Sequence, residues 1–218
     1  FCKGETDISD ASRPILKKEM AECTKNGIAY MELPVAFDAI TVVIHPKNKF
    51  LSKLTAEELR KLWEPAAEGV IKTWDQVNPS WPKEQIKLFG PGKESGTFDY
   101  FTEAIMGKAK ASRNDYTMSE DDNVIVQAVS RDVNALGYFG YSYFQENSKK
   151  LKAAAIVAKD AKVAVLPSVK SVVDASYQPL ARTLFIYVNV KSDERPEVRA
   201  FVDYYLSNAD AAAKQAKY

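Results

Sequence analysis

The residues best suited to chemistry lie in a glycine-rich loop at residues 90–97, which has the sequence GPGKESGT. A β-rich run at 86–89 precedes this loop, and a helical pattern at 98–106 follows it. The Ser-Gly-Thr of residues 95–97 would therefore lie at a helix start, where free backbone N–H groups, two hydroxyls and the positive end of the helix dipole converge. This arrangement predicts an oxyanion site, although an ordinary Ser or Thr cap after a glycine turn is the simpler interpretation.

The loop does not match the common nucleotide-binding motifs. It lacks the GK[ST] ending of a triphosphate loop, and its glycines miss the G-x-G-x-x-G spacing of dinucleotide folds by one residue. We therefore expect no nucleotide and no other cofactor at this loop.

A second segment that carries hydroxyl and carboxylate groups is DISDASRP at residues 7–14. It leads into a helical stretch at 15–25, with Pro14 near the first turn. Asp10 or Ser12 could simply cap this helix. Together with the 90–97 loop, however, the segment gives two hydroxyl-rich helix starts, which would allow a chain with little net charge to bind an anion.

Enzymatic chemistry is disfavoured by the scarcity of partner groups. Ser95 at a helix start could be an activated nucleophile, but the only histidine, His45, lies in an apolar strand before Pro46, where we expect a structural role. The acidic cluster at 120–122 lacks calcium-loop spacing and precedes a helix, where carboxylates are favoured by the helix dipole. The sequence thus predicts no catalytic set and no metal site.

Composition narrows the function classes further. The 218 residues include 30 Lys+Arg against 29 Asp+Glu, so the basic footprint of a nucleic-acid-binding protein is absent. No apolar run approaches the roughly 20 residues of a membrane span. Cys2 and Cys23 could form one disulfide in an oxidising compartment, or remain two free thiols, and their spacing alone leaves both open.

The predicted elements alternate between strands and helices. We expect helices at 15–25, 56–63, 98–106, 124–129 and 195–206, and strands at 28–33, 40–44, 86–89, 135–138, 153–158 and 184–190. A Thr55–Glu58 capping box marks the start of the second helix. This alternation predicts α/β layering with largely parallel sheets, and the strands at 40–44 and 184–190 are candidates for two crossings between lobes.

Four segments carry a family resemblance. They are DISDASRP at 7–14, GPGKESGTFDYF at 90–101, SEDDNV at 119–124 and LGYFGY at 136–141. In this order they closely resemble the phosphate-binding protein of phosphate ABC importers, the PstS family. The resemblance implies a type II periplasmic binding-protein fold with two α/β lobes joined by two crossover strands. Lobe 1 would comprise residues 1–39 and 184–218, and lobe 2 residues 40–183.

The resemblance also implies a ligand set for inorganic phosphate. Ser95, Gly96 and Thr97 would supply hydroxyl and backbone donors from lobe 2, and Asp10, with Ser9 beside it, would come from lobe 1. The family's carboxylate accepts a hydrogen bond from a protonated phosphate oxygen. Sulfate has no such proton, so two negative charges, those of sulfate and of Asp10, would face each other without a proton between them. This repulsion gives the selectivity for phosphate over sulfate a physical basis.

The sequence departs from the family in its cationic ligand. Better-known members have an arginine a few residues before the Ser-Gly-Thr, where this chain has Pro91. Arg113, which follows the helix at 98–106, is the first candidate to replace it, and Arg13 is the second. A solvated surface arginine is the alternative for each.

The family also begins with a strand, a hydroxyl-bearing turn and a helix that precede residue 1 of this sequence. Part of lobe 1 is therefore expected to be missing here. The implied protein is a monomeric periplasmic or extracellular receptor, either free or tethered through a preceding segment, whose partners are phosphate and the ABC permease membrane subunits. The alternatives are a binding-protein scaffold with a structural or adhesive role and no ligand, and a receptor for another oxyanion.

Overall fold

The computed structural model describes residues 1–216 and has an α/β fold. It divides into two compact units. Unit 1 comprises Phe1–Asp38 and the chain from Arg182 onward, and unit 2 comprises Ala39–Ala181. The chain passes between them twice, between residues 38 and 39 and between residues 181 and 182.

Within residues 1–216 the strands form one mixed sheet and one small parallel pair. In the larger sheet the order is β1-β9-β2-β6-β4-β5, with β7 also paired to β2, and β3 pairs with β8. The strands are β1 (Ile8–Ala11), β2 (Tyr30–Ile44), β3 (Lys53–Thr55), β4 (Lys87–Gly90), β5 (Thr117–Met118), β6 (Ala135–Gly140), β7 (Lys152–Ala153), β8 (Ala155–Val157) and β9 (Ala181–Asn189).

The five expected helices begin within two residues of where the sequence places them, whereas α3, α6, α7 and α8 were not expected. They are α1 (Lys17–Lys25), α2 (Ala56–Trp63), α3 (Trp74–Val77), α4 (Gly96–Met106), α5 (Asp122–Arg131), α6 (Tyr141–Asn147), α7 (Val169–Val173), α8 (Val190–Asp193) and α9 (Pro196–Gln215), with a short 3-10 turn at Pro65–Ala67. The capping box of α2 is confirmed, because Glu58 N–H donates to Thr55 Oγ1 at 3.0 Å and Thr55 N–H donates to Glu58 Oε2 at 2.8 Å. Among the described residues, no helix combines the length and apolar character needed to cross a membrane.

The expectation of largely parallel sheets needs correction. The pairs β4–β6, β4–β5 and β3–β8 are parallel, but β1–β9, β2–β6 and β2–β7 are antiparallel. The antiparallel pairs all involve β2 or β9, the two strands that pass between the units. The separate strands expected at 28–33 and 40–44 are also wrong, since β2 runs continuously from Tyr30 to Ile44 through Pro34. Pro34 precedes the residues of β2 that pair with β6 and β7, and a strand edge tolerates a missing N–H.

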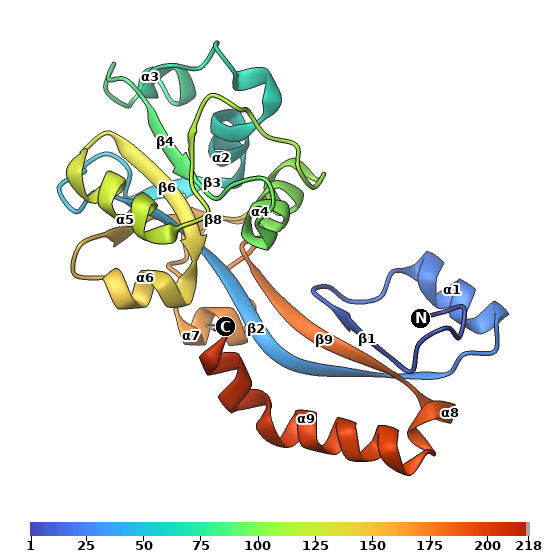
Figure 1. Cartoon of the computed structure of the whole chain (residues 1–218). Coiled ribbons are helices and arrows are strands. Elements are labelled where there is room, and N and C mark those ends of the chain that lie inside the picture. Colours follow the sequence, from blue (N-terminus) through green and yellow to red (C-terminus); the bar gives the residue numbers. More distant parts are fainter. Residues whose placement is uncertain (217–218) are drawn as a thin grey trace. The chain divides into compact units, whose positions relative to one another are not determined.

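In unit 2, alternate residues of β2 and β6 enter different clusters of the core. Val42 and Tyr138 belong to a large cluster with α2 and α4, whereas Val43 and Phe139 belong to a smaller one with α5. This alternation is expected for strands covered on both faces. Helix α4 follows β4 along the chain after the loop at residues 91–95 (Figure 1), and both elements pack into the larger cluster, so this loop is held on a packed scaffold.

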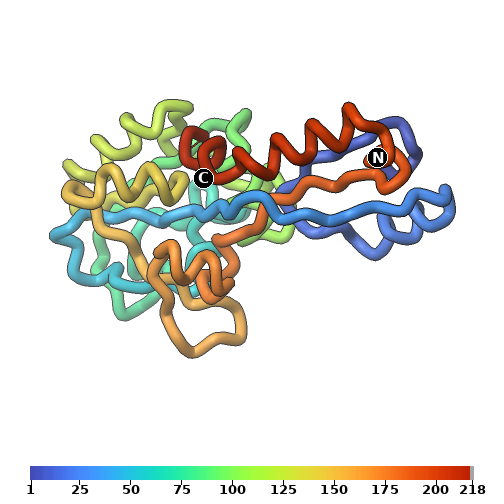
Figure 2. The backbone as a smooth tube through the Cα atoms, turned by 90° about the horizontal axis from the view of Figure 1, so that it is seen from below, coloured from blue at the N-terminus to red at the C-terminus, as the bar shows by residue number. Residues whose placement is uncertain are grey.

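In unit 1, β1 pairs with β9, and β2 runs alongside β9 (Figures 1 and 2). Ile186 and Val188 of β9 form a small buried cluster with Val198 and Val202 of α9. Pro196 at the first turn of α9 has the fixed φ angle that favours a helix start. The register of β1 places Asp10 opposite Ile186.

Candidate functional site

The start of α4 is formed as the sequence predicts. Ser95 is its N-cap, and Ser95 Oγ accepts a hydrogen bond from Thr97 N–H at 3.2 Å. Phe98 and Phe101 are fully buried in the core and fix the first turns of the helix. Gly96 is exposed, and an added Cβ there would meet no atom within 4 Å. The helix start therefore presents hydroxyls and backbone N–H groups on a rigid support.

Two residues that the sequence reasoning did not assign hold the loop before α4. Tyr116 Oη donates to the Pro91 carbonyl at 2.9 Å, and Ser119 N–H donates to the Gly90 carbonyl at 3.0 Å. Burial, with a smaller contribution from the charge of Glu120, raises the pKa of Tyr116 to about 12. Tyr116 therefore stays protonated and donates its hydrogen bond throughout the ordinary pH range.

Gly92 is the point of closest approach in this loop. A Cβ added at Gly92 would lie only 1.8 Å from Glu120 Oε1, so any other residue would have to displace that carboxylate. Glu120 belongs to the SEDDNV segment, which the sequence reasoning used only for its family resemblance. The spacing of glycines in the loop was the signal that a neighbouring side chain approaches the backbone here.

Arg113 must be corrected as the candidate cationic ligand. Arg113 is 4% exposed and is buried in the interior of unit 2. Nε and Nη2 donate to the Asp115 carboxylate, and the remaining contacts are to the Leu62 and Ile71 carbonyls. Because these bonds use every N–H direction of the guanidinium, Arg113 has no donor left for an anion. It instead fixes the loop that precedes β5.

Ser9 and Asp10 lie together in unit 1. Both line a polar hollow of about 600 Å³, together with Arg13 and Glu19. Arg13, the second cationic candidate, is engaged by Glu19 at 2.8 Å. The hydrogen bond from Arg13 is the main cause that lowers the Glu19 pKa to about 2. Asp10 itself is exposed on β1.

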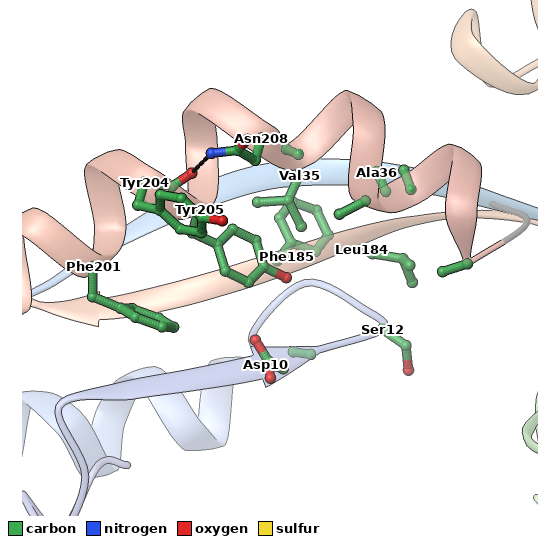
Figure 3. A pocket seen from close by; sticks show the side chains of 15 residues that line it. Asp10, Ser12, Val35, Ala36, Leu184, Phe185, Phe201, Tyr204, Tyr205 and Asn208 are labelled. Atoms are coloured by element: carbon green, nitrogen blue, oxygen red, sulfur yellow. Dashed lines mark hydrogen bonds between the residues drawn. The ribbon is translucent and has the colours of Figure 1, made fainter.

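A second hollow of about 460 Å³ in unit 1 is mainly apolar (Figure 3). Phe201, Tyr204 and Asn208 project into it from α9, and Asp10 also reaches its rim from β1 (Figure 3). The pKa of the neighbouring Tyr205 is raised, mainly by burial and secondarily by the charge of Asp10. Asp10 therefore lies between a polar hollow and an aromatic one.

The predicted site residues divide between the units. Ser95, Gly96 and Thr97 belong to unit 2, whereas Ser9 and Asp10 belong to unit 1. Each unit thus carries one chemically distinct set: donors at a helix start, and a carboxylate beside a hydroxyl on an edge strand.

The remaining polar candidates have local structural roles. Asp121 is the N-cap of α5 and accepts from Asn123 N–H at 2.9 Å, and His45 Nδ1 accepts from Lys47 N–H at 3.0 Å in a turn. In residues 1–216 no three His, Cys, Asp or Glu side chains are grouped so that they could hold a metal ion.

The disulfide is confirmed. Cys2 and Cys23 are bonded across a sequence separation of 21 residues. The bond ties the amino-terminal segment of unit 1 to α1, which ends two residues after Cys23.

Comparison with known proteins identifies a family over most of the chain. The family described as PBP superfamily domain matches residues 1–209. The chain is 53% identical over 219 residues to Protein SphX of Synechocystis, and 37% identical over 221 residues to the phosphate-binding protein PstS of Staphylococcus saprophyticus. Both matches cover 100% of this chain, but the chain spans only 65% and 66% of the length of these relatives.

Solved structures agree on the fold. A possible phosphate binding protein from Planctomyces limnophilus superposes with a TM-score of 0.95 at 46% identity, covering 100% of this chain and 76% of that one. An ABC-type phosphate transport receptor from Vibrio cholerae has a TM-score of 0.68 at 21% identity, covering 96% of this chain and 77% of that one. The two-unit fold with paired crossing strands is therefore a binding-protein fold.

Proposed function

The chain belongs to the PBP superfamily, and we propose that it acts as a receptor that captures inorganic phosphate outside the cytoplasm and delivers it to an ABC importer. The observation that carries this proposal is the capped start of α4, with two hydroxyls and free backbone N–H groups on a packed helix. The names of the relatives support phosphate as the ligand, since PstS is named a phosphate-binding protein and the Planctomyces protein a possible phosphate binding protein.

The donors of the proposed site come from residues 95–97. Ser95 Oγ acts as acceptor toward Thr97 N–H, so its own hydroxyl proton is available to a ligand oxygen. Thr97 offers a second hydroxyl, and the N–H of Gly96 points from the first turn of α4. Hydrogen bonds to an anion are stronger than bonds between neutral groups, and the helix dipole adds to them.

Asp10 is proposed as the acceptor that selects phosphate. A phosphate oxygen that carries a proton can donate to the Asp10 carboxylate, whereas sulfate at neutral pH has no proton to donate. Ser9 adds a hydroxyl in the same polar hollow of unit 1. Arg113 is excluded from this set because the protein already uses its donors.

The proposed protein binds its ligand without chemical conversion and works as a monomer whose partners are phosphate and the permease subunits. The Cys2–Cys23 disulfide supports a location outside the cytoplasm, where such bonds persist. Sustained release of phosphate from a phosphate monoester would contradict this assignment and favour an enzyme.

The test is a titration of thermal unfolding with phosphate, using sulfate as the control anion. A receptor at 100-fold excess of ligand over Kd gains about 2.7 kcal/mol of stability, and phosphate alone should give this gain. Asp10→Asn should weaken phosphate binding about tenfold or more, because a hydrogen bond to a charged group is lost, and should narrow the preference over sulfate. Asp160→Asn, an equal charge change at an exposed position of unit 2, should leave both anions unaffected.

Stabilisation by neither anion would contradict the receptor assignment and favour a scaffold without ligand. Equal stabilisation by both anions would instead identify a general oxyanion receptor, and would remove Asp10 from its selecting role.

A further inference from the structure

Helix α4 is tied at its second turn to the segment through which the chain leaves unit 2. Tyr100 Oη donates to the Pro179 carbonyl at 3.0 Å, across 79 residues of sequence. Pro179 lies two residues before Ala181, where β9 begins and unit 2 ends. The helix that starts at the proposed anion site is therefore bonded to the segment that leads directly into crossing strand β9.

The same segment is bonded to the other crossing strand. Ile40 N–H donates to the Leu180 carbonyl at 2.8 Å, and Tyr177 Oη donates to the Ile40 carbonyl at 3.0 Å. Ile40 is the second residue of unit 2 on β2. The two crossings are thus hydrogen-bonded to each other within unit 2. Leu180, which takes part in this bond, follows Pro179, whose carbonyl accepts from Tyr100.

These bonds are sheltered from water. Tyr177 and Leu180 are fully buried, Ile40 is 1% exposed and Tyr100 is 9% exposed. Burial raises the pKa of Tyr177, so its hydroxyl keeps its proton. Loss of one partner of a buried hydrogen bond leaves an unsatisfied group at a cost, so the Tyr100–Pro179 and Ile40–Leu180 bonds resist separation and can pass a displacement of α4 on to β2.

Within unit 1, the two crossings are also joined by a contact between their residues next to the unit boundary. Arg182 Nε and Nη2 contact Asp38 Oδ2 at 3.0 and 2.9 Å, and these are the first and last residues of unit 1 at the two crossings. The side chains are 19% and 15% exposed. The crossing strands are therefore joined on each side of the boundary, but only the unit 2 side is connected to α4 through Tyr100.

We infer that Tyr100 is a positioning residue that couples anion binding at the start of α4 to the conformation of the crossing strands. This inference rests on the proposed function, because it concerns the same site. A ligand bound at residues 95–97 restrains α4, and the Tyr100–Pro179 bond passes that restraint to residues 179–181 and on to Ile40. Because such coupling is reciprocal, a change in the conformation of the crossing strands must change the phosphate affinity by the same factor.

The test compares two chemically identical changes. Tyr100→Phe removes the hydroxyl that joins α4 to Pro179, whereas Tyr177→Phe removes a more deeply buried hydroxyl that joins the two crossings and donates to Ile40, not to α4. Tyr100→Phe should raise the phosphate Kd about fivefold, as expected for one net hydrogen bond, and mainly through faster dissociation. Tyr177→Phe should lower the unfolding midpoint but leave Kd within about twofold of wild type.

Amide hydrogen exchange gives a readout that a purely structural role would not change. Phosphate should slow exchange of the Ile40 amide in the wild-type chain, and this protection should be largely lost in Tyr100→Phe. A Tyr100→Phe variant with a lower midpoint but wild-type Kd and full Ile40 protection would overturn the inference alone. Failure of the wild-type chain to bind phosphate would overturn both the proposed function and the inference.

Discussion

Units 1 and 2 share the α/β plan but are stabilised by different interactions. Unit 2 has a large apolar core, in which Trp63 contacts Phe101, Tyr116 and Tyr138 at ring-centroid distances of 5.6, 5.1 and 5.0 Å. The buried apolar cluster of unit 1 is small, and Phe201 and Tyr204 on its long helix are 53% and 70% exposed.

Unit 1 compensates with a covalent bond and with ion pairs near its surface. It contains the disulfide, the Arg13–Glu19 pair and the Arg199–Asp193 pair. The proposed donors therefore lie on a unit stabilised by packing, and the proposed acceptor Asp10 on one stabilised by cross-links and charge. The stability of unit 2 should depend mainly on its core volume, whereas that of unit 1 should also depend on redox state through its disulfide.

The largest effect should come from the core of unit 2. Trp63→Ala removes a fully buried indole and should lower the free energy of unfolding of unit 2 by about 3–5 kcal/mol. Phe201→Ala, a comparable truncation of a half-exposed side chain on α9, should cost under about 1 kcal/mol. Denaturant unfolding followed by circular dichroism measures both. Equal losses would show that unit 1 depends on packing as much as unit 2 does.

The disulfide should have the next largest effect, and on unit 1 alone. Its loss should destabilise unit 1 by about 3 kcal/mol, the value expected for a closed loop of this size. Trp63, Trp74 and Trp81 are the chain's 3 tryptophans and all lie in unit 2, so their fluorescence reports that unit separately. Reductant should shift unfolding seen by circular dichroism and leave the fluorescence transition unchanged.

A Cys2→Ser, Cys23→Ala variant serves as the control for the reductant, because it should behave like the reduced chain and be insensitive to further reduction. A fluorescence transition that moves together with the circular dichroism would show that the units unfold as one.

Acid should produce the smallest effect. Arg13 lowers the pKa of Glu19 in the folded chain from 4.5 to about 2. A depressed pKa stabilises the folded state above the unfolded value, so this contribution should be lost as pH falls from about 4.5 to about 2. Because both side chains are substantially exposed, we expect about 1 kcal/mol or less. Glu19→Gln should flatten this part of the stability profile, measured by denaturant unfolding at stepped pH.

Asp115→Asn tests the corresponding group in unit 2. Its pKa is also lowered to about 2, mainly by the hydrogen bond from Arg113. Tryptophan fluorescence should detect the Asp115 effect and not the Glu19 effect. A Glu19 variant that changes the fluorescence profile would contradict the separation of the two units.

Local patterns were sufficient to predict the elements that depend on nearby residues. The α2 capping box, the helix start at residues 95–97 and the alternation of strands and helices follow from short-range hydrogen bonds and hydrophobic period. The strands expected at 28–33 and 40–44 are one strand, because whether Pro34 interrupts a strand depends on the neighbouring strands of the sheet and not on the local sequence.

Long-range contacts account for the parts of the site that the sequence did not predict. Arg113 looks like an exposed cation in the sequence, but Leu62 and Ile71, far away along the chain, bury it and accept its hydrogen bonds. Glu120 and Tyr100 have roles only because Gly92 and Pro179 come to lie beside them in the fold. A single sequence contains no local signal for these pairings.

The hydrogen bond between Ile40 and Leu180 also makes unit 2 a self-contained insertion. The ends of unit 2, Ala39 and Ala181, lie next to this bonded pair, so its two termini are close together. A single continuous stretch of the gene encodes the whole unit. Unit 1 has no such property, because its chain is interrupted by that insertion. Residues 39–181 could therefore be excised and expressed as an independent module, whereas unit 1 would need a linker between Asp38 and Arg182 to become one polypeptide.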